Sequence, residues 1–104
     1  MSTLRLAAVA AFLLLSGTAR AEDTAIEIEN FTFNPPEVTV KPGTTVTWKN
    51  ADDIPHSVVE DATKFRSKPL DTGETFSMTF TKAGEIGYFC GLHPHMKGKI
   101  IVKP

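Results

Sequence analysis

Apolar and polar residues alternate with a period of two along most of the chain after residue 22, and no helical period interrupts that alternation. In AIEIENFTF (25–33) acidic residues occupy intervening positions, and in ETFSMTF (74–80) threonine and serine do so. This period is typical of a β-strand with one face in a core and the other in solvent. The residues predicted to face the core from these two segments are Ile26, Ile28, Phe31 or Phe33, Phe76, Met78 and Phe80.

About seven short strands are predicted, separated by turns rich in proline and glycine. They cover residues 25–33, 37–40, 44–50, 56–60, 74–80, 85–90 and 99–102. Short strands with turn residues at this spacing indicate an all-β fold, either an antiparallel sandwich or a barrel. The longest connection covers residues 61–73, and we expect Phe65 and Leu70 to anchor it to the core. Trp48 is predicted to be a core residue.

The first 21 residues are predicted to be a secretory signal peptide that is removed. Arg5 supplies a positive charge, residues 6–15 are apolar, and small residues lead to Ala19-Arg20-Ala21, which has the A-x-A form of a cleavage site. The apolar run is shorter than a bilayer-spanning helix requires. Residues 22–104 are therefore expected to form a single exported domain without a membrane span in its mature form.

Charge and cysteine content narrow the functional classes. Removal of Arg5 and Arg20 leaves nine of the eleven basic residues against twelve acidic ones, a net charge of −3 with histidine neutral. So mild a charge argues against binding to nucleic acid or to a membrane surface. Cys90 is the only cysteine, so no internal disulfide can form. It remains open whether Cys90 is a buried apolar residue, a reactive thiol, an intermolecular bridge or a metal ligand.

The segment YFCGLHPHM (88–96) favours the last of these roles. Cys90, His93 and Met96 form a C-x-x-H-x-x-M motif, which places a candidate ligand at every third residue. Thiolate, imidazole and thioether ligands together favour copper, whereas structural zinc sites more often use four cysteine or histidine ligands. His95 is the competing histidine, but we expect Pro94 to turn it outward into solvent.

His56, which follows the sequence DDIP, is the candidate for a further ligand. If it lies at the same end of a sandwich as residues 90–96, it completes a plane of two histidines and one cysteine with a more distant methionine. That set is the type 1, or blue, copper arrangement, which suits electron transfer. The alternative is an ordinary surface histidine at the start of a strand.

The sequences FNPPEVTVKPGTTVTWKNADDIPHSV and TFSMTFTKAGEIGYFCGLHPHMKGKIIV resemble the small cupredoxins of the plastocyanin, pseudoazurin and amicyanin group. The likeness covers about residues 25–103, and the short ligand loop is most similar to that of amicyanin. The resemblance implies an eight-stranded Greek-key β-sandwich with one copper ion, whose ligands by motif position are His56, Cys90, His93 and Met96. The chain departs from its relatives at Gly91, where many carry a hydroxyl residue, and at Ser57, where many carry asparagine.

These features predict a periplasmic electron carrier, not an enzyme, that cycles between Cu(I) and Cu(II) and acts as a monomer. Its expected partners are redox proteins, a c-type cytochrome or a periplasmic dehydrogenase or oxidase, docking near His93. Leu92 is expected to face solvent beside that histidine and to contribute to the docking face. The alternative function is a copper-binding or copper-delivery module without an electron-transfer role, for which the additional His95 is the only indication.

Overall fold

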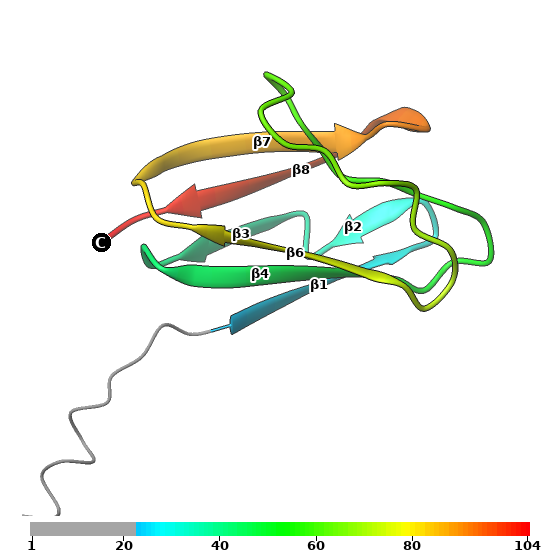
Figure 1. Cartoon of the computed structure of the whole chain (residues 1–104), viewed down its shortest axis with the longest axis horizontal. Helices are drawn as coiled ribbons and strands as arrows, with labels where there is room; N and C mark the ends of the chain where they lie inside the picture. The colour runs from blue at the N-terminus through cyan, green and yellow to red at the C-terminus, as the bar shows by residue number, and fades with distance from the viewer. Residues whose placement is uncertain (1–22) are drawn as a thin grey trace, which may run out of the picture.

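The computed structural model describes residues 23–104, which form two four-stranded sheets packed face to face (Figure 1). The first sheet has the strand order β2-β1-β4-β6 and the second the order β3-β8-β7-β5. The strands are β1 (Asp23–Glu29), β2 (Thr32–Asn34), β3 (Glu37–Val40), β4 (Thr44–Asn50), β5 (Val59–Glu60), β6 (Thr75–Phe80), β7 (Gly84–Cys90) and β8 (His93–Val102). The predicted β-sandwich is therefore confirmed. The predicted signal peptide, residues 1–21, lies outside the described residues.

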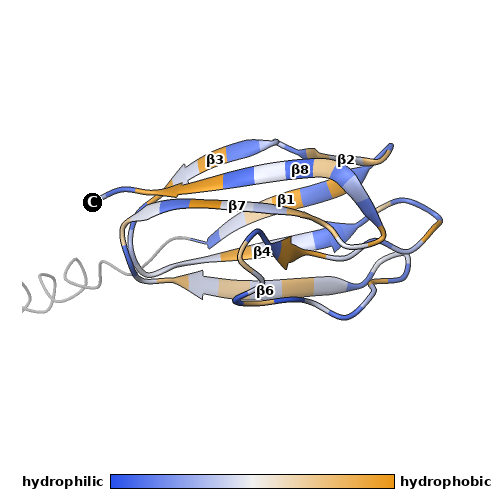
Figure 2. Ribbon diagram, turned by 90° about the horizontal axis from the view of Figure 1, so that it is seen from above, coloured by the Kyte–Doolittle hydropathy of each residue, from blue (hydrophilic) through white to orange (hydrophobic). Residues whose placement is uncertain are grey.

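Alternation along the strands generates the core between the sheets, and the hydropathy colouring in Figure 2 follows it. In β4 every second residue is buried, including Val46 and Trp48. Apolar burial is the main favourable term in folding, so this pattern fixes which face of each strand turns inward. Of the predicted core residues, Ile26, Ile28, Phe33, Trp48, Leu70 and Phe80 are buried, and Phe65, Phe76 and Met78 are partly buried against the core.

Two pairings differ from the antiparallel expectation. β1 runs parallel to β4, and β3 runs parallel to β8. Alternation alone cannot distinguish parallel from antiparallel pairing, because it reports only which face of a strand is buried. In chain order, β3 of the second sheet lies between β1 and β4 of the first sheet.

Three predicted strand boundaries are wrong. The segment predicted as a strand over 25–33 is divided by a two-residue turn at Asn30 and Phe31 between β1 and β2, with Glu29 paired to Thr32. β8 begins at His93 rather than at residue 99, because a turn at Gly91 and Leu92 lets the β7–β8 hairpin pair to its end.

The third error concerns residues 56–60, of which only Val59 and Glu60 lie in a strand. His56 pairs instead with Leu70, through two backbone hydrogen bonds between these residues of 2.7 and 3.2 Å. The connection over residues 61–73 thus folds back on the segment after β4, and the backbone of Leu70 takes the hydrogen bonds of His56 that a sheet strand would otherwise make. Leu70 is buried in the core, as expected for an anchor.

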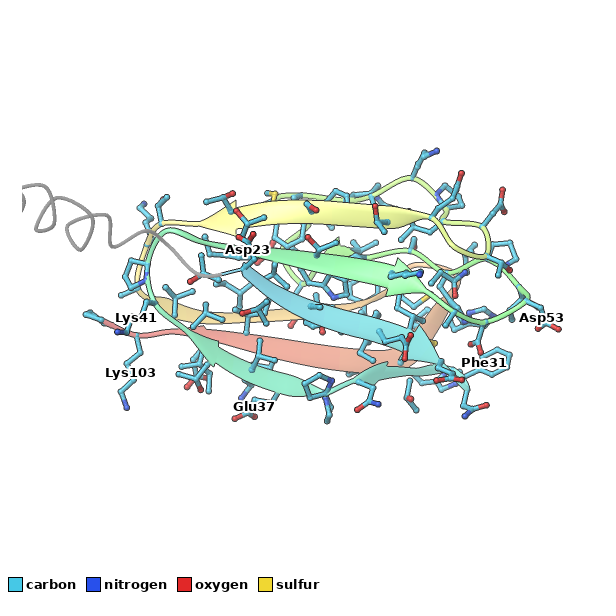
Figure 3. All side chains as sticks on the ribbon, turned by 90° about the horizontal axis from the view of Figure 1, so that it is seen from below. Asp23, Phe31, Glu37, Lys41, Asp53 and Lys103 are labelled. Atoms are coloured by element: carbon cyan, nitrogen blue, oxygen red, sulfur yellow. The ribbon has the colours of Figure 1, made fainter. Side chains whose placement is uncertain are left out.

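The two ends of the sandwich carry different kinds of structure. Figure 3 shows Phe31 and Asp53 at one end and Lys41 and Lys103 at the other. The turn between β1 and β2 and the segment after β4 share the first end. Within residues 23–104, no helix has the length and apolar character needed to cross a membrane.

Candidate metal centre

Three segments bring two histidines and the cysteine together at one end of the sandwich. Cys90 is the last residue of β7, His93 is the first residue of β8, and the two are paired across the hairpin. The register shifts between Phe89 and Cys90, an irregularity that re-aims side chains at the end of a strand. His56 arrives from the segment between β4 and β5. The structure therefore unites residues that are 34 positions apart in the sequence.

The atoms of this cluster have the spacing of ligands to one ion. Nδ1 of His56 and Nδ1 of His93 each lie 3.6 Å from Sγ of Cys90, and one candidate ligand atom from each residue lies within 4.8 Å of the others. A ligand nitrogen about 2.0 Å and a ligand sulfur about 2.3 Å from one ion such as zinc, roughly 110–120° apart, are about 3.6 Å from each other. The three side chains thus fit a single metal ion.

The carboxylate of Asp52 fixes the orientation of the His56 ring. Nε2 of His56 lies 2.8 Å from Oδ2 of Asp52, and the imidazole is fully buried. An ionised carboxylate only accepts hydrogen bonds, so Nε2 carries the proton and Nδ1 keeps its lone pair toward Cys90. A hydrogen bond of this kind sets the tautomer and raises the basicity of a metal-binding histidine.

Asp52 is itself held in the ionised form. Burial alone would raise the pKa of its carboxyl, but hydrogen bonds from the backbone N–H groups of Phe31 and Asn30 and from His56 outweigh burial and lower that pKa below the ordinary value of 3.8. The distances are 3.0 Å from Phe31 N to Oδ2 and 2.7 Å from Asn30 N to Oδ1. The carboxylate is therefore a fixed negative charge beside His56 at neutral pH.

Asn50 anchors the segment that carries Asp52 and His56. Its Nδ2 donates to the carbonyl oxygens of Ile54 at 2.9 Å and Leu70 at 2.8 Å, and its Oδ1 accepts from the backbone N–H of Asp52 at 2.9 Å. The side chain is completely buried, and all three of its partners are backbone groups outside the named strands. Asn50 thus determines the path of the chain from β4 to His56.

The two departures from the family pattern, Ser57 and Gly91, contact each other beside Cys90. The Ser57 N–H donates to Sγ of Cys90 at 3.3 Å, and Oγ of Ser57 accepts from the N–H of Gly91 at 2.9 Å. A Cβ at position 91 would lie 2.8 Å from Oγ of Ser57 and 3.1 Å from Cγ2 of Val59. Glycine at 91 therefore leaves room for the serine hydroxyl.

His93 occupies a more open position than His56, because its side chain is only partly buried. The ring of Phe31 lies edge-on to both imidazoles, at centroid distances of 5.1 Å from His93 and 5.4 Å from His56. The two imidazole rings are 5.0 Å apart. Phe31 therefore covers part of a cluster that the hairpin alone leaves exposed.

Three further residues of the segment 90–96 are of interest from the sequence: Leu92, His95 and Met96. Met96 is 3% exposed and belongs to the same buried cluster as Cys90, so its thioether is on the inner side of β8. His95 is exposed, as predicted from the proline before it. Leu92 is also exposed, as predicted, with 49% of its surface accessible.

Sequence reasoning missed Asp52, and it left Phe31 and Phe33 as alternatives for one core position. Asp52 lies four residues before His56 in an irregular segment, where no helical or strand periodicity predicts which side chains are in contact. Phe31 is 47% exposed at the turn, while Phe33 takes the core position. The available signal for the turn was Asn30, since asparagine tolerates positive φ and is common in two-residue hairpin turns.

The fold and the site define a class: an all-β sandwich that carries a buried cysteine and two histidines at one end, in an arrangement that can hold a metal. Residues 4–102 match the family model described as a cupredoxin-like domain, and the chain belongs to that family.

Amicyanin of Paracoccus versutus is 39% identical over 90 residues, covering 80% of this chain and 67% of the relative. Chloroplastic plastocyanin of Oryza sativa subsp. indica is 36% identical over 113 residues, covering 91% of this chain and 71% of the relative. The structure described as a novel purple cupredoxin from Nitrosopumilus maritimus superposes with a TM-score of 0.73 at 33% identity, covering 78% of this chain and all of that one.

Proposed function

We propose that this protein is a type 1 copper protein that carries single electrons between redox partners. The observation that carries the proposal is the convergence of one buried cysteine sulfur with Nδ1 of two histidines at 3.6 Å each. Thiolate and imidazole ligands together favour copper over harder ions. Membership of a family that includes amicyanin and plastocyanin relatives supports the same assignment.

In this proposal His56, Cys90 and His93 are the strong ligands and Met96 is the weak one. A copper ion bound there supplies one-electron chemistry between its two oxidation states. The chain keeps the site in nearly one shape, because Asp52 orients His56 and the N–H of Ser57 points to the cysteine sulfur. Such preorganisation limits the rearrangement that an electron transfer requires, and a hydrogen bond to the sulfur tunes the potential.

Electrons enter and leave through His93, which is the less buried of the two histidines. Leu92 is exposed beside it, and Pro55 is exposed on the segment that leads to His56. An apolar surface of this kind suits a weak, transient interface with a redox protein such as a c-type cytochrome, a dehydrogenase or an oxidase. We propose that the protein acts as a monomer in these encounters and is not itself an enzyme.

The cellular place follows from the predicted signal peptide at residues 1–21. Cleavage after Ala21 would deliver residues 22–104 to the periplasm, where the proposed partners are found. Analysis of the N-terminus of the protein recovered from periplasmic extract tests this part, and an uncleaved protein retained in the cytoplasm would contradict it.

Addition of Cu(II) to the metal-free protein tests the proposal. We expect an intense visible band that disappears on reduction and returns on reoxidation, because it arises from the bond between the thiolate and copper. Cys90→Ser should abolish the band, and Met78→Leu, which changes a half-buried methionine of β6, should retain it. A band that persists without the cysteine would refute the site. A colourless, readily exchanged ion would instead favour copper delivery.

A further inference from the structure

The turn that carries Phe31 has an unusual backbone. Asn30 and Phe31 are the two residues between β1 and β2, and both have positive φ, 53° and 57°. Hairpin turns with positive φ at both positions favour asparagine followed by glycine, because a side chain at the second position is strained. Asn30 fits that preference and Phe31 opposes it. A strained residue persists where its surroundings hold it, and such residues cluster at functional sites.

Asp52 holds this turn from the opposite segment. Its Oδ1 accepts from Asn30 N and its Oδ2 accepts from Phe31 N, and the same Oδ2 accepts from Nε2 of His56. One carboxylate therefore joins the turn to a histidine of the metal centre. The turn cannot move away from the site without breaking charge-assisted hydrogen bonds.

The ring of Phe31 reaches from the turn to both histidines. Its plane stands at 88° to the imidazole of His56 and at 87° to that of His93, both edge-to-face arrangements. In Figure 3, Phe31 lies at the outer end of the sandwich, away from the core between the sheets. Among residues 23–104 no carboxylate is hydrogen-bonded to His93 as Asp52 is to His56. The contact with Phe31 is therefore one of three restraints on the His93 ring, together with its contacts to Cys90 and His56.

We propose that Phe31 is a positioning residue of the metal centre: the turn held by Asp52 keeps its ring against both imidazoles and restrains His93. The inference rests on the proposed copper site, since the Phe31 ring is argued to hold His93 in a position to bind copper. It also explains why a strained residue is kept at position 31, because glycine there would relieve the strain but would lack the ring.

Two glycine variants separate the ring from the turn. Phe31→Gly removes the strained side chain together with its ring, whereas Asn30→Gly places glycine at the other positive-φ position of the turn and keeps the ring. Both metal-free variants should unfold at the same or a higher denaturant concentration than the parent. After loading with Cu(I), only Phe31→Gly should transfer the metal to a chelator faster, by about tenfold. Parent-like transfer from a folded Phe31→Gly protein, or equal acceleration in Asn30→Gly, would overturn the proposal.

A metal-free measurement distinguishes this inference from the proposed function. In NMR spectra of the histidine side chains, the parent and Asn30→Gly should show a single ordered His93 ring with contacts to Phe31, and Phe31→Gly should show an averaged ring. If the parent does not bind copper, the proposed function fails and these spectra alone decide whether Phe31 orders His93. If Phe31→Gly does not fold, Phe31→Leu takes its place, and an unchanged His93 ring in that variant would refute the role of the aromatic ring.

Discussion

Two regions of the sandwich differ in how their buried polar atoms are bonded: the metal end, which carries His56, Cys90 and His93, and the aromatic middle, which carries Trp48 and Tyr88. At the metal end Asn50, His56 and Ser57 are all buried, and each side chain makes hydrogen bonds. In the middle, Trp48 and Tyr88 pack edge to face at 5.2 Å, yet Nε1 of Trp48 and Oη of Tyr88 have no hydrogen-bond partner within residues 23–104.

This difference separates two tasks. The aromatic middle is stabilised by burial of the large apolar area of its rings. This burial offsets the cost of an unpaired polar atom. A Cβ at Gly98 would lie 2.3 Å from the Tyr88 ring, so glycine lets the ring pack closely against β8. The metal end obtains a defined geometry from directional bonds, and losing one partner there leaves another buried group unpaired. Substitutions should therefore be costly at the metal end even where little volume changes.

The largest effect is expected from Asp52→Ala, which removes the acceptor of two backbone N–H groups and of His56. We expect the metal-free protein to lose about 2–3 kcal/mol of unfolding free energy at pH 7, measured by urea denaturation. Asp53→Ala, at the exposed neighbouring position, is the matched control and should change stability little. Equal stability of the two variants would show that the metal end is not held by Asp52.

The same pair gives a pH dependence. Because the pKa of Asp52 in the folded state lies below its ordinary value of 3.8, its ionised form stabilises the fold above that value. This contribution is lost as the pH falls through the folded-state pKa. The difference in stability between the parent and Asp52→Ala should therefore be full at pH 7 and decrease below about pH 4. A difference that does not change over this range would contradict the ionic role.

Tyr88→Phe should behave differently, because its effect on the free energy of unfolding should appear only at high pH. Burial raises the pKa of Tyr88 from 10.0 to about 12. The neutral phenol is favoured in the folded state, so its contribution is complete below pH 10 and declines as the pH approaches 12. At pH 7 the variant should match the parent closely, since the hydroxyl has no partner to lose.

Urea denaturation of both proteins from pH 8 to pH 12 measures this effect. The parent should lose about 2 kcal/mol relative to Tyr88→Phe by pH 12. Parallel curves would mean that the hydroxyl ionises without cost and that the middle is more polar than its packing indicates.

The smallest effect on the molecule itself is expected from Leu92→Glu. Leu92 is exposed, so copper content, visible spectrum and stability should stay close to those of the parent. Electron transfer to a partner should slow, because a charge is introduced into the proposed contact surface. Stopped-flow kinetics with a c-type cytochrome measure the rate. Loss of copper would show that Leu92 supports the metal site, and an unchanged rate would show that the docking face lies elsewhere.

The fold class and the four candidate ligands could be predicted from the amino-acid sequence alone. Alternation in β4 and β6 reports burial directly, because successive side chains of a strand point to opposite faces. The spacing of Cys90, His93 and Met96 is local, so the motif is legible without knowledge of the fold. The relative direction of the strands, however, cannot be predicted from alternation. The parallel pairs of β1 with β4 and of β3 with β8 are seen only in the folded structure.

The surroundings of the candidate ligands are apparent only from the folded structure. Asp52 meets the Asn30–Phe31 turn across more than twenty residues of sequence, and Ser57 meets Gly91 across 34. These contacts depend on where irregular segments converge at the end of the sandwich, and irregular segments follow no period that a sequence displays. Phe31 shows the limit most clearly. Its place in an alternating segment made it one of two alternatives for the core, but the positive φ of the turn carried its side chain to the metal end instead.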